Sequence, residues 1–210
     1  FLLGEKLINK LFIKKYITTY KKEPVIFIHI PKAAGTSVSN ALYGKRNGHL
    51  TAELIKERLG NKYLDKYSFA VSRNPYERLE SAYRFARKGK TKDGAVANPE
   101  MYQQSEFNTF ESFIKNWLIY QDLKSVDPVF KPQYTFVFDG ENNLLVNEVF
   151  KLENMHLVQD KLSDLLNKPI DIGLKNSTSG SDKKTLYDKE LKQIVYKLYK
   201  EDFILLDYEK

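Results

Sequence analysis

Residues 25–37 read Val-Ile-Phe-Ile-His-Ile-Pro-Lys-Ala-Ala-Gly-Thr-Ser, an apolar run that breaks at a proline and a glycine. The run over 25–30 is short and rich in β-branched residues at both alternating positions, which is typical of a strand buried on both faces of a parallel sheet. Pro31 to Gly35 end it, and the hydroxyl residues that follow favour a helix over 36–43. A buried strand, a loop and a helix in this order predict the start of a βαβ unit.

The same order recurs downstream. Residues 68–72 predict a second buried strand, and Pro75 suits the first position of a helix that we expect over 75–88. Apolar spacing also predicts helices over 51–59, 110–118, 158–166 and 186–199, and a loop over 89–105. Apolar stretches over 134–138 and 144–150 flank Asp139 and Gly140, which predicts a hairpin or a bulged turn there. We therefore expect an α/β fold of three layers, with a mostly parallel central sheet flanked by helices.

Composition narrows the class of protein. The 210 residues are enough for one sizeable domain, and 42% hydrophobic with 29% charged residues excludes disordered, collagen-like and coiled-coil proteins. We expect an amphipathic helix over 1–23 and one domain over 24–210. No apolar run is long enough to cross a bilayer. The absence of cysteine excludes disulfides, thiolate metal sites and a cysteine nucleophile, and it fits a reducing compartment.

The formal net charge of +7 suggests an anionic partner. Residues 1–23 are rich in lysine, and their apolar residues recur at helical spacing. This helix is expected to pack on the domain, and a peripheral contact with a membrane surface is the alternative. A second basic cluster, at the end of the helix expected over 75–88, contains Arg84, Arg87 and Lys88.

Two stretches have the residue types of an anion site. The first is the loop between the strand and the helix, where unpaired N–H groups of a helix N-terminus attract phosphate-like anions. Gly35 permits close approach of the backbone, Thr36 and Ser37 add hydroxyl donors, and Lys32 adds a full charge. Because Lys32 precedes the glycine, the order differs from the phosphate loop of ordinary ATPases and kinases.

The second stretch runs from Arg73, at a predicted strand end, to Ser81, two turns inside the following helix. Arginine matches phosphate geometry better than lysine. Arg78 could join such a site or form a helix salt bridge with Glu77 or Asp65. Both stretches lie at a strand-to-helix junction, and it is this pairing that is specific.

Together, residues 29–37 and 73–83 resemble the two binding elements for PAPS (3′-phosphoadenosine 5′-phosphosulfate) in carbohydrate O-sulfotransferases, particularly the heparan 2-O- and chondroitin 4-O-sulfotransferases. Weaker similarities follow at Gln133, at 153–154, at 176–177 and at 199–208. The resemblance implies a P-loop-like fold, transfer of a sulfuryl group from PAPS to a carbohydrate hydroxyl with PAP as product, and no metal. It places the 5′-phosphosulfate at Pro31, Lys32, Ala33, Ala34, Gly35, Thr36 and Ser37, and the 3′-phosphate at Arg73 and Ser81.

The resemblance also assigns roles in catalysis. Lys32 is expected to stabilise charge on the leaving oxygen. His49, on a loop at the same end of the sheet, is the predicted general base, because imidazole titrates nearest neutral pH and related 2-O-sulfotransferases use a histidine. Glu53 is the alternative base. Acceptor contacts are predicted for Arg84, Arg87, Lys88 and Gln133, and the loop over 175–184 is expected to close over the nucleotide or to be a solvated linker.

Two other functions are compatible with parts of the pattern. A nucleotide or sugar kinase with a degenerate phosphate loop would need an acidic magnesium ligand at a strand end, and Asp139 lies in the predicted hairpin instead. A basic nucleic-acid-binding module could stack bases on its 14 Tyr and 13 Phe, but these mostly fall on apolar faces. We expect no nucleic-acid partner, and a bacterial, cytoplasmic enzyme of polysaccharide biosynthesis. The sequence does not indicate the oligomeric state.

Overall fold

The structure is a computed structural model that describes residues 2–91, 94–96, 98–173 and 186–210, and at 2–10, 90–91 and 94–95 it describes the backbone only. The chain folds into two compact units. One unit contains residues 1–30, 34–71 and 135–173, and the other contains 31–33, 72–134 and 174–210. The chain passes between the units inside the predicted phosphate loop and at the end of the second strand. The predicted boundary between residues 23 and 24 stays a prediction.

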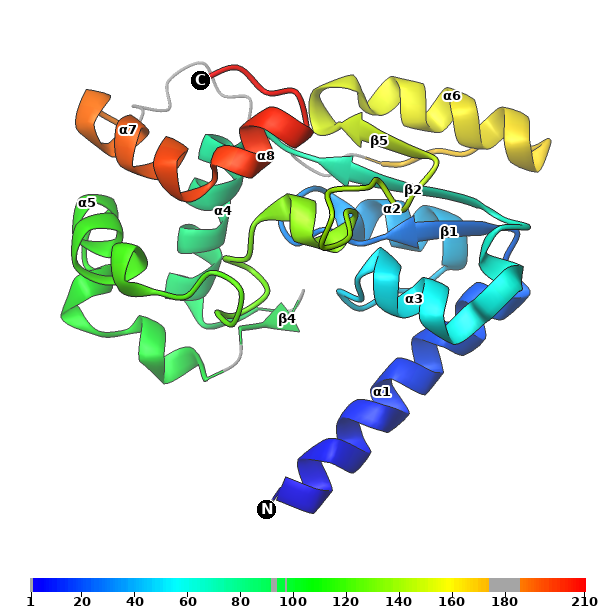
Figure 1. The fold of residues 1–210 in the computed structure, drawn as a ribbon, viewed down its shortest axis with the longest axis horizontal. Coiled ribbons are helices and arrows are strands. Elements are labelled where there is room, and N and C mark those ends of the chain that lie inside the picture. Colours follow the sequence, from blue (N-terminus) through cyan, green and yellow to red (C-terminus); the bar gives the residue numbers. More distant parts are fainter. Residues whose placement is uncertain (1, 92–93, 97, 174–185) are drawn as a thin grey trace. The chain divides into compact units, whose positions relative to one another are not determined.

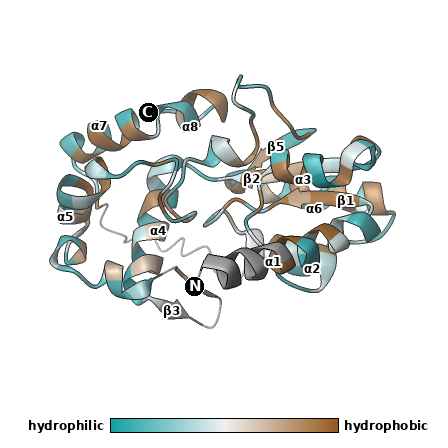
Figure 2. Ribbon diagram, turned by 60° about the horizontal axis from the view of Figure 1, so that its bottom comes forward, coloured by the Kyte–Doolittle hydropathy of each residue, from teal (hydrophilic) through white to brown (hydrophobic). Residues whose placement is uncertain are grey.

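The first unit is built on a three-stranded sheet with the order β1 (Val25–Ile28), β2 (Tyr67–Ser72) and β5 (Glu148–Lys151). Strands β1 and β2 pair in parallel, with Val25 opposite Tyr67 and Ile28 opposite Ala70, and the arrows of all three strands point the same way (Figure 1). β1 consists only of apolar residues, which colour it brown in Figure 2, and it is buried throughout. This is the strand that residues 25–30 predict.

Helices flank this sheet. Val25, Phe27 and Phe69 pack in one cluster with Val38 of α2 (Gly35–Tyr43) and Val158 of α6 (Met155–Leu166). Side chains alternate along a strand, so Ile26 and Ile28 point to the opposite face, where they are also fully buried. The remaining helices of the unit are α1 (Leu2–Lys22), which packs against α3 (Ala52–Leu59), and the 3-10 turns η1 (Gly60–Tyr63) and η7 (Leu152–Asn154). The α/β class with a parallel sheet flanked by helices is confirmed.

The second unit is mainly helical. The long helix α4 (Pro75–Lys88) shares an aromatic core with α5 (Phe110–Ser112), η4 (Phe113–Trp117), η5 (Leu118–Tyr120), α7 (Lys189–Leu198) and α8 (Lys200–Leu205). Rings of Tyr83, Phe107, Phe113 and Phe130 lie in this core, with the Phe113 and Phe130 centroids 5.4 Å apart. A nucleic-acid-binding module would expose aromatic rings to stack on bases, whereas these four rings are used for packing.

Several predicted elements differ in the structure. The strand predicted over 134–138 is wrong, because the chain forms a 3-10 turn there, η6 (Gln133–Phe136). The turn around Asp139 does form: Phe138 and Leu144 make an antiparallel bridge, and the N–H of Leu145 donates to the carbonyl of Val137 at 2.8 Å. The predicted loop over 89–105 contains a short antiparallel pair, β3 (Lys90–Thr91) with β4 (Gly94–Ala95), and the turns η2 (Pro99–Tyr102) and η3 (Ser105–Phe107). The helix predicted over 110–118 widens into the π-helical segment η4.

Candidate active site

The loop that follows β1 has an unusual backbone. Lys32 and Ala34 both have positive φ, at 68° and 57°, although neither is glycine. The left-handed conformation costs an L-residue roughly 1–2 kcal/mol. Successive backbone N–H groups that alternate between left- and right-handed conformations form concave anion sites, and strain of this kind concentrates at functional sites. This backbone fits the prediction that the loop binds an anion.

The helix that begins at this loop has no side-chain cap. Ala34 is the N-cap of α2 and has no side-chain oxygen, so the first-turn N–H groups receive no bond from a capping side chain. Ala34 does accept the N–H groups of Ser37 and Val38 through its carbonyl, at 3.0 and 3.2 Å. Thr36 and Ser37 are half-buried on the first turn. A helix N-terminus in this state attracts negative charge.

Gly35 is required by a neighbouring ring. A Cβ at this position would lie 1.8 Å from Cδ2 of His29, which is far inside van der Waals contact. His29 itself is buried, and its Nδ1 donates to the carbonyl of Asn47 at 2.8 Å. The ring therefore cannot move aside without losing this bond. His29 is therefore fixed beside the loop.

His49 lies next to His29. Its Nδ1 lies 3.0 Å from the carbonyl oxygen of His29, and the two imidazole centroids are 4.2 Å apart. A carbonyl oxygen only accepts, so Nδ1 of His49 is the nitrogen that carries hydrogen, and in neutral imidazole Nε2 is then the basic nitrogen. His49 is exposed. Glu53, the alternative base, is exposed on the first turn of α3. Thr51 caps this helix, because its hydroxyl accepts the N–H of Leu54.

Lys32 belongs to the second unit and contacts α4. Its ammonium lies 4.2 Å from the ring centroid of Phe85, a cation–π distance, and the residue is half-buried. The aromatic ring gives the flexible side chain a defined position next to the left-handed turn of its own backbone.

Arg73 is held by its backbone. Its N–H donates to Oε1 of Gln133 at 2.9 Å, and its carbonyl accepts from Nε2 of the same amide at 2.8 Å. Gln133 is fully buried. The carboxylate of Asp202, also fully buried, accepts the backbone N–H groups of Gln133 and Tyr134 at 2.9 and 2.8 Å. Asp202 thus fixes Gln133, and Gln133 fixes Arg73.

The side chain of Arg73 is paired on the surface of α4. Its Nε and Nη2 donate to Oε2 of Glu77, one turn further along, at 3.2 and 3.0 Å. Guanidinium has five N–H donors, so this pair occupies two of them. Ser81 lies half-buried one turn beyond Glu77.

A model of the sulfotransferase family matches residues 15–209, which is nearly the whole chain. The chain belongs to the sulfotransferase family. No curated protein and no solved structure matches this sequence. The match makes the protein a transferase of sulfuryl groups and agrees with the α/β fold described above.

Arg78 of this sulfotransferase corrects one expectation. A surface salt bridge with Glu77 or Asp65 was possible from sequence, but Arg78 is buried and donates from Nη1 and Nη2 to the carbonyls of Val129 and Lys131, at 3.1 and 2.8 Å. Its guanidinium also lies 5.7 Å from the ring of Tyr199. Burial raises the pKa of Asp202, and the charge of Arg78 opposes that rise. Arg78 therefore supports the segment that leads into Gln133.

The predicted acceptor residues of the sulfotransferase occupy different environments. Arg84 pairs with Glu80 at 2.7 Å, Arg87 lies 5.7 Å from the ring of Tyr83, and Lys88 is exposed at the end of α4. The side-chain amide of Gln133 is hydrogen-bonded to the backbone of Arg73. A contact between these four residues and an acceptor stays a prediction, and the loop predicted over 175–184 lies outside the described residues.

Sequence reasoning missed Asn47 and gave Asp202 no role. Asn47 is buried, and although its carbonyl accepts from His29, its amide has no hydrogen-bond partner. The only signal for Asp202 was its position in the weak similarity at 199–208. In the described ranges no cluster of acidic or histidine side chains could hold a metal ion, and no helix is long and apolar enough to span a bilayer.

Proposed function

We propose that this sulfotransferase transfers the sulfuryl group of PAPS to a hydroxyl group of a carbohydrate. The observation that carries the proposal is the loop at Lys32–Ser37, where a strained left-handed backbone, an obligatory glycine and an uncapped helix N-terminus follow one another. Such a backbone presents N–H groups to an anion at close range, and it does so without the Gly-Lys-Ser/Thr order of nucleoside triphosphate enzymes.

In this proposal Pro31 to Ser37 bind the 5′-phosphosulfate, and Arg73 with Ser81 binds the 3′-phosphate. PAPS supplies an activated sulfuryl group on a phosphate that leaves as PAP. Lys32 places a positive charge where the leaving oxygen becomes anionic, so it stabilises the transition state more than the ground state. Hydroxyl groups of Thr36 and Ser37 donate to the same oxygens.

The proposed general base is Nε2 of His49. With Nδ1 bonded to the carbonyl of His29, the ring has a fixed tautomer and a fixed orientation. Nε2 then accepts the proton of the acceptor hydroxyl as its oxygen attacks sulfur. The exposed Arg84, Arg87 and Lys88 are proposed to meet an acidic acceptor. We further propose a bacterial enzyme that acts in the cytoplasm on a glycan precursor, lipid-linked or nucleotide-linked.

The first experiment compares thermal stabilisation by PAP, by ATP with Mg²⁺ and by single-stranded DNA. PAP alone should raise Tm, because only PAP combines a 5′-phosphate with a 3′-phosphate monoester, the group that Arg73 is proposed to bind. The second experiment incubates the enzyme with radiolabelled PAPS and a panel of glycans, and locates the label by mass spectrometry. The proposal would be overturned if ATP or DNA raised Tm and PAP did not. It would also be overturned if the label were found on a protein tyrosine and not on a sugar.

A further inference from the structure

The outer side of α1 is not used to build the fold. The inner side of this helix is buried at Ile17 and Tyr20, and the Tyr20 hydroxyl donates to the carbonyl of Phe27 in β1 at 2.9 Å. Gly48 is held against the same helix, since a Cβ there would lie 2.7 Å from the Tyr16 ring. These contacts attach α1 firmly to its unit and leave its opposite side to solvent.

Basic residues occupy that opposite side. Five exposed residues recur there at helical spacing: Leu11, Lys14, Lys15, Thr18 and Lys22. The hydroxyl of Thr18 is bonded to the carbonyl of Lys14 at 2.8 Å, so it needs no other partner. The exposed side of the helix therefore offers mainly lysine ammonium groups.

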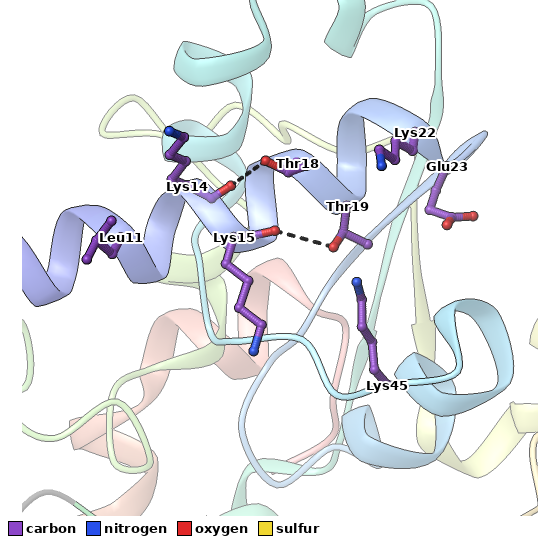
Figure 3. Close-up of a pocket in the computed structure, with 8 residues that line it drawn as sticks. All are labelled: Leu11, Lys14, Lys15, Thr18, Thr19, Lys22, Glu23 and Lys45. Atoms are coloured by element: carbon purple, nitrogen blue, oxygen red, sulfur yellow. Dashed lines mark hydrogen bonds between the residues drawn. The ribbon is translucent and has the colours of Figure 1, made fainter.

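These residues line an open groove of about 440 Å³. Figure 3 shows Lys14, Lys15 and Lys22 on the helix and Lys45, from the segment after α2, with its side chain directed toward the helix near Thr19. The lining has four lysines and a single acidic residue, Glu23. None of the ion pairs in the described part of the chain includes any of these lysines. Four like charges that no carboxylate neutralises favour an anionic partner.

Exposed apolar side chains lie next to the lysines. Leu11 is 58% exposed. Phe12 is 45% exposed, although its ring packs on the Tyr16 ring and lies beside Gly48 on the flank of the helix. The sequence continues the four-residue spacing before Leu11 with Leu7 and Leu3. Lysines beside exposed leucine and phenylalanine on one helix are typical of the interface of an anionic bilayer, where apolar side chains enter the acyl boundary and lysines reach the phosphates.

We propose that the outer face of α1, with Lys45, docks on a membrane surface that contains anionic phospholipid. A soluble acidic polysaccharide would engage the lysines but would not bury Leu11, so the exposed leucine favours lipid. This docking does not depend on the proposed function, because it involves neither PAPS nor the acceptor. It would bring the enzyme to a lipid-linked acceptor.

The test is co-sedimentation with phosphatidylcholine vesicles, with and without phosphatidylglycerol. The protein should bind only the anionic vesicles, and binding should weaken as salt is added. The triple variant K14Q/K15Q/K22Q should lose roughly 100-fold in affinity, at about fivefold for each lysine. L11S should lose roughly fivefold, because it removes apolar area.

The matched control is K189Q/K197Q/K200Q, which removes the same charge from exposed positions of the other unit. It should keep most of the vesicle affinity. The two triple variants should retain the wild-type Tm and the wild-type rate of sulfuryl transfer to a soluble acceptor, which separates this proposal from the proposed function. Equal loss by both triple variants, equal binding to neutral vesicles, or tighter binding to a soluble sulfated polysaccharide than to vesicles would overturn it.

Discussion

The two strand-to-helix junctions of this sulfotransferase differ in backbone conformation and in how the helix that follows is capped. After β1 the chain turns through left-handed residues at Lys32 and Ala34, and α2 starts without a side-chain cap. After β2 the chain enters α4 by regular means: Asn74 accepts the N–H of Tyr76 at 3.0 Å, and Pro75 occupies the first helical position.

This difference separates a backbone anion site from a side-chain anion site. The uncapped α2 leaves its first-turn N–H groups to a ligand, and the strained turn sets their direction. At the N-terminus of α4 the side chain of Asn74 already accepts one N–H group, so we expect an anion there to be bound mainly by side chains such as Arg73. On the proposed function, the first junction would bind the reacting phosphosulfate, and the second a phosphate that takes no part in the reaction.

The histidine beside the first junction should have the largest effect. His49→Ala is expected to lower kcat by roughly 10² to 10⁴, the usual contribution of a general base, and to leave the Kd for PAP unchanged. Labelled transfer and calorimetry measure the two quantities. Glu53→Ala is the matched control and should keep its turnover; if instead Glu53→Ala is inactive and His49→Ala is not, the base is Glu53.

Lys32 tests the chemical role of the first junction. Lys32→Ala should lower kcat by roughly 10² or more, because its charge is needed most as the leaving oxygen becomes anionic. The Kd for PAP should rise only modestly, since the loop N–H groups and Arg73 remain. Unchanged turnover would mean that the first junction binds the donor without assisting the reaction.

Arg73 should show the opposite pattern. The 3′-phosphate is the same in ground and transition states, so Arg73→Ala should weaken PAP binding roughly 10- to 100-fold and raise KM for PAPS, with little change in kcat at saturation. A titration of AMP, which lacks the 3′-phosphate, should give the same Kd for the variant and the wild type. A drop in kcat as large as that of Lys32→Ala would contradict the division between the junctions.

Gln133 sharpens the side-chain half of the comparison. Because its amide bonds both backbone groups of Arg73, Gln133→Leu should displace Arg73 and reduce the preference for PAP over AMP by roughly tenfold. The ratio of the two dissociation constants is the readout, since general loss of structure would weaken both ligands alike. A variant that binds PAP and AMP with unchanged preference would show that Arg73 does not need this support.

The caps themselves should give the smallest effect. Asn74→Ala should lower the free energy of unfolding in urea by about 1 kcal/mol, because α4 loses its capping bond. Ala34→Gly should cause no loss and can add up to about 1 kcal/mol, because glycine adopts the left-handed conformation without strain. Equal losses from both changes would show that the two helix starts do not differ.

Local sequence determined the elements whose signals are local. The helix expected over 75–88 has those bounds in the structure, because Asn74, Pro75 and Gly89 set its ends without help from distant residues. β1, with its apolar residues at both alternating positions, was predictable for the same reason. The parallel sheet, the glycine-containing loop and the family followed from these stretches, and the family match over residues 15–209 agrees with them.

Tertiary structure decided what depends on partners far along the chain. The strand expected over 134–138 became a 3-10 turn because the carboxylate of Asp202 accepts the N–H groups of Gln133 and Tyr134. Arg78, for which the sequence left a site role or a helix salt bridge open, is buried because the carbonyls of Val129 and Lys131 are placed to receive its N–H groups. The contact between His29 and His49 likewise joins residues that spacing does not relate. A buried polar group is stable only where hydrogen-bond partners meet it, and the positions of those partners depend on the packing of the whole unit.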